Sequence, residues 1–501
     1  MAFSKPKREI YARKIKNFWT DFSHNKIGFA GLIIILTYVV VAICAPNLTP
    51  YLPESQRYKP PKVAARYAYP EWFRIFPQYS ELNPTVNIST NLNEARLAEK
   101  KGSLTIDMAN LIFNFNSTKK YETASFTLDL GNFTYDYAPP PSMTMNVYFE
   151  LEYCNATITI YYTIKNYTAN QLYEEYFKDP TQAKMKIYIQ KYDPKKPWGK
   201  ITNNFAIDSF VDVPGSYPIL TSLYKEGTTY VDPAEIIFSQ KGTYGIQVTF
   251  EFKSLQARGY ANLKLNYVGL TIWGRCHGIL GTNNSGFDVW TELVYGARIS
   301  LVVGLLAALI GTLIGVFYGV VSGYLGGFVD EFLMRVVDVL LCIPVLPILL
   351  VLVRYFSANV FLIVVLIAIF GWQGLSRVVR SRVLSLKEMA FIESARASGA
   401  SDFYLMVHHL IPNVTPIAIP ALILSVPGAI ITEASLSFLG FGDPNAATWG
   451  RILYGAYQLG GLHAWWVWLP AGLAITILCI GFVFIGHAID EIVNPKLRRR
   501  R

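Results

Sequence analysis

The chain has 501 residues, of which 52% are hydrophobic, with a mean hydropathy of +0.28 and a formal net charge of +10. This composition excludes an ordinary soluble protein and indicates that part of the chain lies in a lipid bilayer. The basic residues flank apolar runs and do not form a stripe on a soluble domain, which argues against a nucleic-acid partner.

Residues 1–26 are basic and precede the first apolar run, Ile27 to Ala45. This run is close to the ~20 residues that a helix needs to cross the hydrocarbon layer. Because cytoplasmic segments carry an excess of Lys and Arg, we expect residues 1–26 inside the cell and residues 27–46 to form a first membrane span that runs outward. A cleaved signal peptide is the alternative, but the run is long and bulky and no small-residue cleavage site follows it.

Residues 47–277 have a different composition, rich in Tyr, Asn, Thr and Pro, and contain no apolar run of spanning length. Apolar and polar residues alternate there with the period of a β-strand, between Gly, Pro or Asn residues. The clearest predicted strands are Met143–Leu151, Ala156–Ile164, Met185–Tyr192, Tyr244–Phe252 and Asn262–Ile272. Several short strands of this kind predict an extracellular, sandwich-like β domain inserted between the first two membrane helices.

Glycosylation triplets support a location of this insert outside the cell. Asn-x-Ser/Thr triplets crowd here, which supports an exported and glycosylated surface, although an Asn- and Thr-rich sequence produces some by chance. They begin at Asn47, Asn87, Asn116, Asn132, Asn155, Asn166 and Asn283. Of the chain's five cysteines, Cys154 and Cys276 fall in this region, and a disulfide between them stays open at this point.

Residues 278–501 return to the membrane. The apolar runs there are Ile299–Val321, Leu333–Val353, Val360–Gly371, Ile417–Ile431 and Trp465–Ile485. With the first span they predict a mainly α-helical membrane protein of six transmembrane helices, with both termini in the cytoplasm. Arg377, Arg380 and Lys387 between spans four and five, and the basic segment 496–501, agree with this orientation.

The inner loop, residues 386–413, lies between spans four and five and is polar but structured. Residues 388–398 favour a helix, and Gly399 stands where a left-handed residue ends one. Ser401 can cap a second helix, whose apolar positions are predicted at Phe403, Val407, Leu410 and Ile411. Pro412 is predicted to end that helix. The sequence therefore predicts a compact helix-turn-helix that is presented to a partner outside the lipid.

This loop resembles the EAA loop of permeases of ATP-binding cassette (ABC) importers. Glu393-Ser394-Ala395 is followed after three residues by Gly399 and, nine residues later, by a segment ending in His409-Leu410-Ile411-Pro412. Ser394 replaces an Ala of the family pattern. His409 replaces an Ile, as is usual in the dipeptide and oligopeptide branch, which also carries nickel and oligosaccharides.

Other segments are similar to the same branch. They are His277–Asp288, Tyr295–Leu301, Gly323–Gly327, Met334–Leu340, Ser435–Gly442 and Asn494–Arg498. The likeness covers residues 1–50 loosely and 277–501 nearly throughout, and is closest to the C-type partner of a heterodimeric permease. Phe287 stands where the family usually has Arg, which leaves that arginine's contacts in doubt. The insert is much longer than the usual outer loop of the family, and the resemblance says nothing about it.

The resemblance implies a type I ABC-importer permease and an import cycle. An extracellular solute-binding protein delivers the solute, two six-span permease chains form the path, and two cytoplasmic ABC ATPases bind the EAA loops. Glu393, Ser394, Ala395, Gly399, His409 and Pro412 are then the expected ATPase-coupling residues. No G-x-x-x-x-G-K-[ST] segment occurs in the sequence, so ATP and Mg²⁺ are expected on the partner ATPases, with no cofactor, metal or catalytic residue in this chain.

Polar residues within the spans are candidates for the path or its gate. Arg335 and Asp338 lie three residues apart, where a structural ion pair on one helical face is favoured over a contact with the solute. Glu433 falls at the expected outer end of span five, beside the segment that contains Phe438. Glu433 and Phe438 could line the path or its gate, and Glu433 is about as well explained as a residue at the membrane interface.

Two other classes of function compete with the permease. A membrane-anchored outer-surface receptor or adhesin would act through the β domain, and a self-contained channel or secondary transporter would use the spans alone. Neither needs the structured inner loop. Within the permease hypothesis, the insert is expected to help dock the solute-binding protein or to shield the path, and the solute itself is not specified by the sequence.

Overall fold

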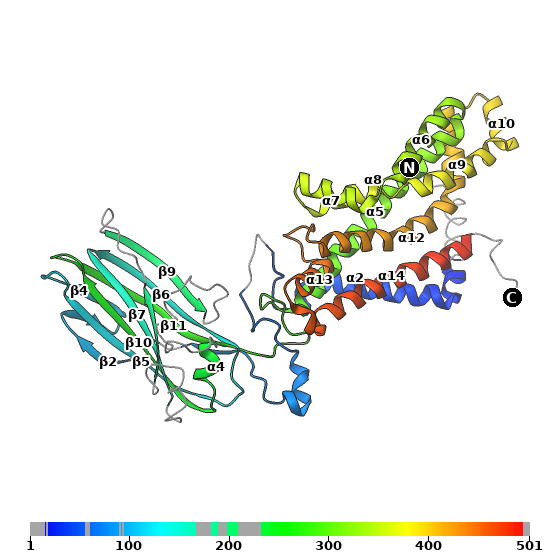
Figure 1. Cartoon of the computed structure of the whole chain (residues 1–501). Helices are drawn as coiled ribbons and strands as arrows, with labels where there is room; N and C mark the ends of the chain where they lie inside the picture. The colour runs from blue at the N-terminus through cyan, green and yellow to red at the C-terminus, as the bar shows by residue number, and fades with distance from the viewer. Residues whose placement is uncertain are drawn as a thin grey trace. The chain divides into compact units, whose positions relative to one another are not determined.

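The computed structural model describes residues 16, 19–55, 61–89, 92, 95–166, 182–188, 198–208 and 232–493 (Figure 1). The chain divides into two compact units. The membrane unit consists of residues 1–61 and 287–501, and the β unit of Lys62–Gly286. The basic residues expected at both ends of the chain, before residue 16 and after residue 493, lie outside the described residues.

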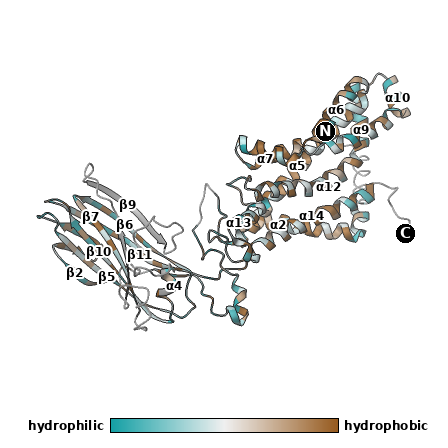
Figure 2. Cartoon of the chain, viewed as in Figure 1, coloured by the Kyte–Doolittle hydropathy of each residue, from teal (hydrophilic) through white to brown (hydrophobic). Residues whose placement is uncertain are grey.

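Among the described residues of the membrane unit, four helices are long and apolar enough to cross a bilayer, and the number rises to six if each of two bent helix pairs is one span. The apolar residues follow these helices along their length (Figure 2). The four are α2 (Lys26–Leu48), α5 (Val289–Leu325), the helix from Asp402 to Phe438, and α14 (Trp465–Val493). The predicted multi-span membrane protein is therefore confirmed.

The two bent pairs stand where spans three and four are predicted. Helices α6 (Gly327–Cys342) and α7 (Val345–Phe356) meet at 85°, next to Pro344. Helices α8 (Val360–Ile369) and α9 (Gln373–Lys387) meet at 41°. The arginines predicted in a loop after span four thus lie on a helix, α9. A short helix, α13 (Trp449–Gln458), with η4 (Gly461–His463) precedes α14.

Glycines set the distance between α5 and α9. A Cβ atom added at Gly315, Gly319 or Gly323 would lie 3.0, 2.6 or 2.9 Å, respectively, from a backbone oxygen. These oxygens belong to Trp372, the N-cap of α9, and to Ser376 and Arg380 within α9. The glycines and the oxygens each recur every fourth residue, so one face of α5 lies against the backbone of α9. Small residues at this spacing are typical of membrane helices in close contact.

The β unit consists of two antiparallel sheets. One has the order β3-β4-β11-β6-β9 with β1 also paired to β11, and the other has the order β2-β5-β10-β7-β8. The strands are β1 (Val86–Ser89), β2 (Arg96–Lys101), β3 (Leu104–Asp107), β4 (Ile112–Asn116), β5 (Thr123–Tyr135), β6 (Ser142–Cys154), β7 (Ala156–Asn166), β8 (Gln182–Tyr188), β9 (Trp198–Asp208), β10 (Gly242–Ser254) and β11 (Tyr260–Trp273). The described part of the unit also contains the short helices η1 (Glu71–Ile75), η2 (Pro77–Tyr79) and α4 (Pro233–Ile237).

One aromatic core joins the two sheets. The Phe113 ring of one sheet stacks on the Phe126 ring of the other with centroids 3.8 Å apart, and Phe126 also stacks on Phe250 at 4.9 Å. The buried Tyr162 hydroxyl donates to the Gly269 carbonyl across the core at 3.1 Å. The predicted strands and their face-to-face packing are confirmed, except that the end of the strand predicted over 185–192 lies outside the described residues.

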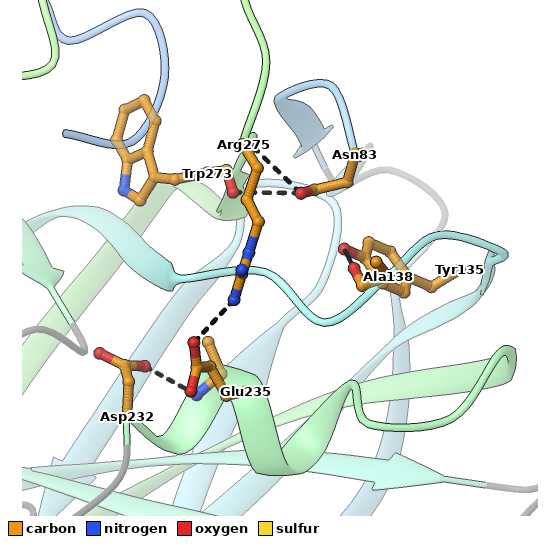
Figure 3. Close-up of polar contacts among 8 residues, drawn as sticks. Asn83, Tyr135, Ala138, Asp232, Glu235, Trp273 and Arg275 are labelled. Carbon is orange, nitrogen blue, oxygen red and sulfur yellow. Dashed lines mark hydrogen bonds and ion pairs between the residues drawn. The ribbon is translucent and has the colours of Figure 1, made fainter. Parts of the chain in front are cut away.

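The segment after β11 is held at one end of the sandwich by polar contacts (Figure 3). The Asn83 side chain accepts from the Arg275 N–H at 3.0 Å and donates to the Trp273 carbonyl at 3.1 Å. The Arg275 guanidinium lies 2.8 Å from a Glu235 carboxylate oxygen on α4. These contacts hold residues 273–275 within the β unit.

The β unit shifts both boundaries of the predicted 47–277 insert. At the first boundary, the Thr49 hydroxyl lies 2.5 Å from that of Thr291, so residues just after α2 pack on α5. At the second, the Thr282 N–H donates to the Ala68 carbonyl at 3.1 Å. Within the unit the acceptor residues Asn87, Asn116 and Asn132 are exposed, and glycosylation stays a prediction.

Cys154 and Cys276 do not form a disulfide in this structure, because both thiols are free. Cys154 pairs in register with Tyr260 at the first residue of β11, whereas Cys276 follows the last residue of that strand, Trp273. The 14-residue strand separates them, and at ~3.3 Å per residue its length far exceeds the reach of a disulfide.

Thiol labelling at pH 7.5 tests this arrangement. Burial raises the pKa of the Cys276 thiol to about 11, so its reactive thiolate is scarce and we expect slow alkylation of the folded protein. Cys154 is half-buried and is expected to react faster. Both should react without reductant once the chain is denatured. Peptide mass spectrometry distinguishes them from the other cysteines, and a denatured, unreduced chain in which both resist labelling would contradict the free thiols.

Candidate functional site

The inner loop forms the predicted helix-turn-helix, here called the hairpin: α10 (Ala390–Ala397), Gly399 and α11 (Asp402–Leu405). Gly399 has a φ of +85° and no atom within 4 Å of an added Cβ. The glycine is therefore required by the backbone conformation and not by lack of space. The Ser401 hydroxyl caps α11 by accepting from the Tyr404 N–H at 3.3 Å, as predicted.

The hairpin rests on the ends of α5 and α9 through one apolar cluster. Ile392, Leu405, Leu410 and Val414 are fully buried. They pack with Val320 and Tyr324 of α5 and with Val379, Val383 and Leu386 of α9.

The predicted apolar face of the second helix is wrong in part, because Phe403 is 70% exposed and Val407 is also on the surface. The buried positions run 405, 410, 414, a spacing of five and then four. The cause is a π-helical turn, η3 (Met406–Leu410), in which the Ile411 N–H bonds to the Met406 carbonyl five residues earlier. One extra residue in this turn shifts the buried face.

Pro412 does not end a helix, which corrects the prediction. It lies in the first turn of α12 (Ile411–Phe438), and the chain is helical from Asp402 to Phe438. Proline has no N–H to continue the helical hydrogen bonds, and Pro412 comes directly after the π-helical turn Met406–Leu410, through which the helix continues past it. Pro420 and Pro427 likewise lie inside α12, which remains one helix.

The free surface of the hairpin combines small and aromatic residues. Glu393, Ser394, Ala397 and Gly399 are exposed, and Ala395 is half-buried. Beside them lie the exposed apolar side chains Met389, Phe391, Phe403, Tyr404 and Val407. An exposed apolar patch of this kind, with small residues that allow close backbone approach, is typical of a protein interface.

His409 lies between the two arms of the hairpin. Its ring centroid is 6.2 Å from that of Phe391 on α10 and 5.8 Å from that of Tyr404 on α11. His408 stacks on Tyr404 at 4.3 Å. Both histidines thus take part in aromatic packing within the hairpin, and the expected ATPase-coupling role of His409 stays a prediction.

Tyr324, near the end of α5, contacts both arms and was missed from the sequence. Its hydroxyl donates to Asp402 Oδ1 at 2.5 Å and accepts from Arg396 Nη2 at 3.2 Å. The Arg396 guanidinium also lies 5.7 Å from the tyrosine ring centre. No local pattern reveals this site, because the partners lie 78 and 72 residues away along the chain.

The predicted ion pair between Arg335 and Asp338 is wrong. Arg335 lies 3.7 Å from Glu331 one turn earlier, and Asp338 pairs with Arg377 of α9. The prediction used only the spacing of residues within one helix. It could not include Arg377 of the neighbouring helix, which competes with Arg335 for Asp338. A second pair joins the same helices, since Asp330 of α6 accepts from Arg380 Nε at 2.5 Å and also binds the Ser322 hydroxyl of α5.

Glu433 and Phe438 lie near the end of α12. Glu433 is buried, and its Oε1 accepts from the Ser437 hydroxyl at 2.6 Å. The Phe438 ring centroid is 5.4 Å from that of Tyr457 on α13. Both side chains therefore face packing within this chain, and a role in the path or gate stays a prediction.

The two pairs between α6 and α9 form a matched test. Asp330 is nearly buried, so Arg380→Ala leaves a desolvated carboxylate without its cation and is expected to cost about 2–4 kcal/mol. Arg377→Ala breaks a pair that is about half exposed and is expected to cost less than ~1 kcal/mol. Thermal unfolding of the purified protein in detergent measures both, and equal losses would contradict this ranking.

Two family descriptions match the chain. "Binding-protein-dependent transport system inner membrane component" matches residues 311–499, and "N-terminal TM domain of oligopeptide transport permease C" matches residues 15–61. Residues 62–310, which include the whole β unit, lie outside both matches.

Curated relatives agree with these matches. The oligopeptide transport system permease protein OppC of Salmonella typhimurium is 40% identical over 220 residues, which cover 44% of this chain and 72% of the relative. OppC of Bacillus subtilis is 36% identical with the same coverage. A solved chain of the MetNI methionine ABC transporter is 22% identical, with a TM-score of 0.34 over 40% of this chain and 96% of that chain. That score is too low to carry an argument about the fold.

Proposed function

Because this chain belongs to the binding-protein-dependent transport permeases, as an OppC-type permease subunit of an ABC importer, we propose that its solutes are oligopeptides. Its relatives named above are oligopeptide permeases, which supports peptides over the nickel or oligosaccharides of the same branch. We assign it the C-type position beside a second six-span permease chain, with which it forms the translocation path.

The other partners follow from the same proposal. Two cytoplasmic ABC ATPases bind ATP and Mg²⁺, since the chain contains no nucleotide-binding loop motif. An extracellular solute-binding protein delivers the peptide. Both termini and the hairpin then lie in the cytoplasm, and the β unit lies outside the cell. The lysines and arginines of residues 1–26, 377–387 and 496–501 support this orientation.

The hairpin is the observation that carries the proposal. It ends in an exposed surface of small and aromatic residues, yet its opposite face is packed into a fully buried cluster with α5 and α9. A receptor or a self-contained channel has no use for such a surface. When the bound ATPases close, a hairpin that packs rigidly on two membrane helices moves with them as a rigid body. It thereby transmits the movement of the ATPases to these helices.

Uptake by the reconstituted transporter tests the coupling role. Gly399→Val places a β-branched residue at positive φ and is expected to abolish most uptake, whereas Gly399→Asn tolerates that conformation and should retain more. Glu393→Lys reverses the exposed charge of the hairpin and should reduce uptake by about tenfold or more, as expected when one charged interface contact becomes repulsive.

Co-purification of the partners separates the classes of function. The wild-type chain extracted in mild detergent should bring a second permease and two ATPases, and Glu393→Lys should bring less ATPase with an unchanged permease partner. A chain that arrives alone supports the outer-surface receptor. Wild-type uptake and ATPase binding in both Gly399→Val and Glu393→Lys would contradict the docking role.

For the β unit we propose capture of the solute-binding protein, with shielding of the path as the alternative. The chain enters and leaves this unit at neighbouring residues, since the Val63 N–H donates to the Gly286 carbonyl at 3.0 Å. A short Gly-Ser linker can therefore replace Lys62–Gly286 without pulling α2 and α5 apart.

This replacement is expected to weaken binding-protein capture while ATPase assembly is unchanged. Capture is measured as the Kd of the binding protein for transporter in nanodiscs, and assembly as the amount of co-purified ATPase. Equal capture by the shortened chain would leave shielding as the role of the unit. Loss of the ATPases would mean that the deletion damages the membrane unit.

A further inference from the structure

We propose that Tyr324 is a positioning residue through which movement of the hairpin enters α5. The proposal rests on the coupling role of the hairpin described above. It concerns the contact behind the hairpin, on the side opposite the surface that docks the ATPase.

One phenolic hydroxyl joins three elements. The guanidinium of Arg396 on α10 donates to it, and it donates to the carboxylate of Asp402 on α11. Tyr324 is 7% exposed, whereas Arg396 and Asp402 lie on the surface, so these bonds are partly buried. Bonds that involve charged groups are stronger and more directional than neutral ones. The two arms of the hairpin are thus held to one atom of α5 on both sides of the Gly399 bend.

The other connections of the hairpin are easier to deform. The backbone leaves the α-helical pattern at Glu388 and Met389 before α10, at Ser398 and Gly399 between the arms, and in the π-turn Met406–Leu410 before α12. The apolar cluster below the hairpin has no directional bonds of its own. A displacement of the hairpin therefore reaches α5 through Tyr324 more directly than it reaches α12 along the backbone.

Helix α5 is placed to distribute such a movement. Next to Tyr324, Gly323 lies against the backbone of Arg380 on α9, and farther along α5 a side chain at Gly304 would lie 2.7 Å from Ile430 of α12. Helices packed this closely have no empty space between them into which one could shift alone. A shift of the end of α5 must therefore move α9 and α12 with it.

The test compares two tyrosine hydroxyls on the same helix. Tyr324→Phe keeps the ring and removes only the bonds to Arg396 and Asp402. Tyr318→Phe is the control, because its hydroxyl donates to the Leu333 carbonyl of α6 at 3.0 Å and touches neither arm of the hairpin. ATP hydrolysis and peptide uptake are measured in the same vesicles that contain the complete transporter with its binding protein.

We expect Tyr324→Phe to raise the ATP hydrolysed per peptide by about fivefold, the effect of losing two partly buried hydrogen bonds. ATPase co-purification should be unchanged, and Tyr318→Phe should resemble the wild type. A merely structural role would lower the amount of folded protein or of ATPase and leave the ratio constant. Asp402→Ala should raise the ratio as well, and the double variant should not exceed the larger single effect, because both changes break one chain of bonds.

The proposal is overturned if Tyr324→Phe hydrolyses as much ATP per peptide as the wild type. It is also overturned if Tyr318→Phe raises the ATP hydrolysed per peptide by the same factor as Tyr324→Phe. If Gly399→Val still abolishes uptake in that case, only the role of Tyr324 fails. If Gly399→Val and Glu393→Lys are also fully active, the coupling role of the hairpin fails with it.

Discussion

The close contact between α5 and α9 is the constraint on which the rest of the membrane unit depends. Gly315, Gly319 and Gly323 bring the two backbones together, and the helices then carry the buried cluster beneath the hairpin. The same contact places Ser322 and Tyr324 beside their partners on α6 and on the hairpin. A methyl group at Gly319 would meet a carbonyl oxygen that cannot move aside, so the position of the hairpin is set by glycines it does not touch.

Local rules predicted the features that depend on a few neighbouring residues. Gly399 and Ser401 were identified because a left-handed glycine and a serine cap act within one turn of the chain. The strands of the β unit follow from alternation for the same reason. Their order does not, since β10 lies between β5 and β7, and β11 between β4 and β6, through contacts distant in sequence.

The errors share a cause in tertiary structure. Asp338 takes Arg377 from another helix in preference to Arg335 on its own, and the hydroxyl of Tyr324 has partners more than seventy residues away. The outcome at Pro412 depends on a π-turn, for which the sequence carries no marker known to us. Helical periodicity assumes 3.6 residues per turn, and it loses its phase wherever the chain departs from that value.

The π-turn at Met406–Leu410 also has a consequence for orientation. One residue more than an α-helical turn changes the rotation about the helix axis by about 100°. The hairpin is therefore rotated about the axis of α12 relative to the orientation that a regular α-helix leading into α12 would give it. The direction in which Glu393 and its neighbours face therefore depends on the number of residues between Ser401 and Pro412, and an insertion or deletion there would turn the exposed surface of the hairpin without altering any residue in it.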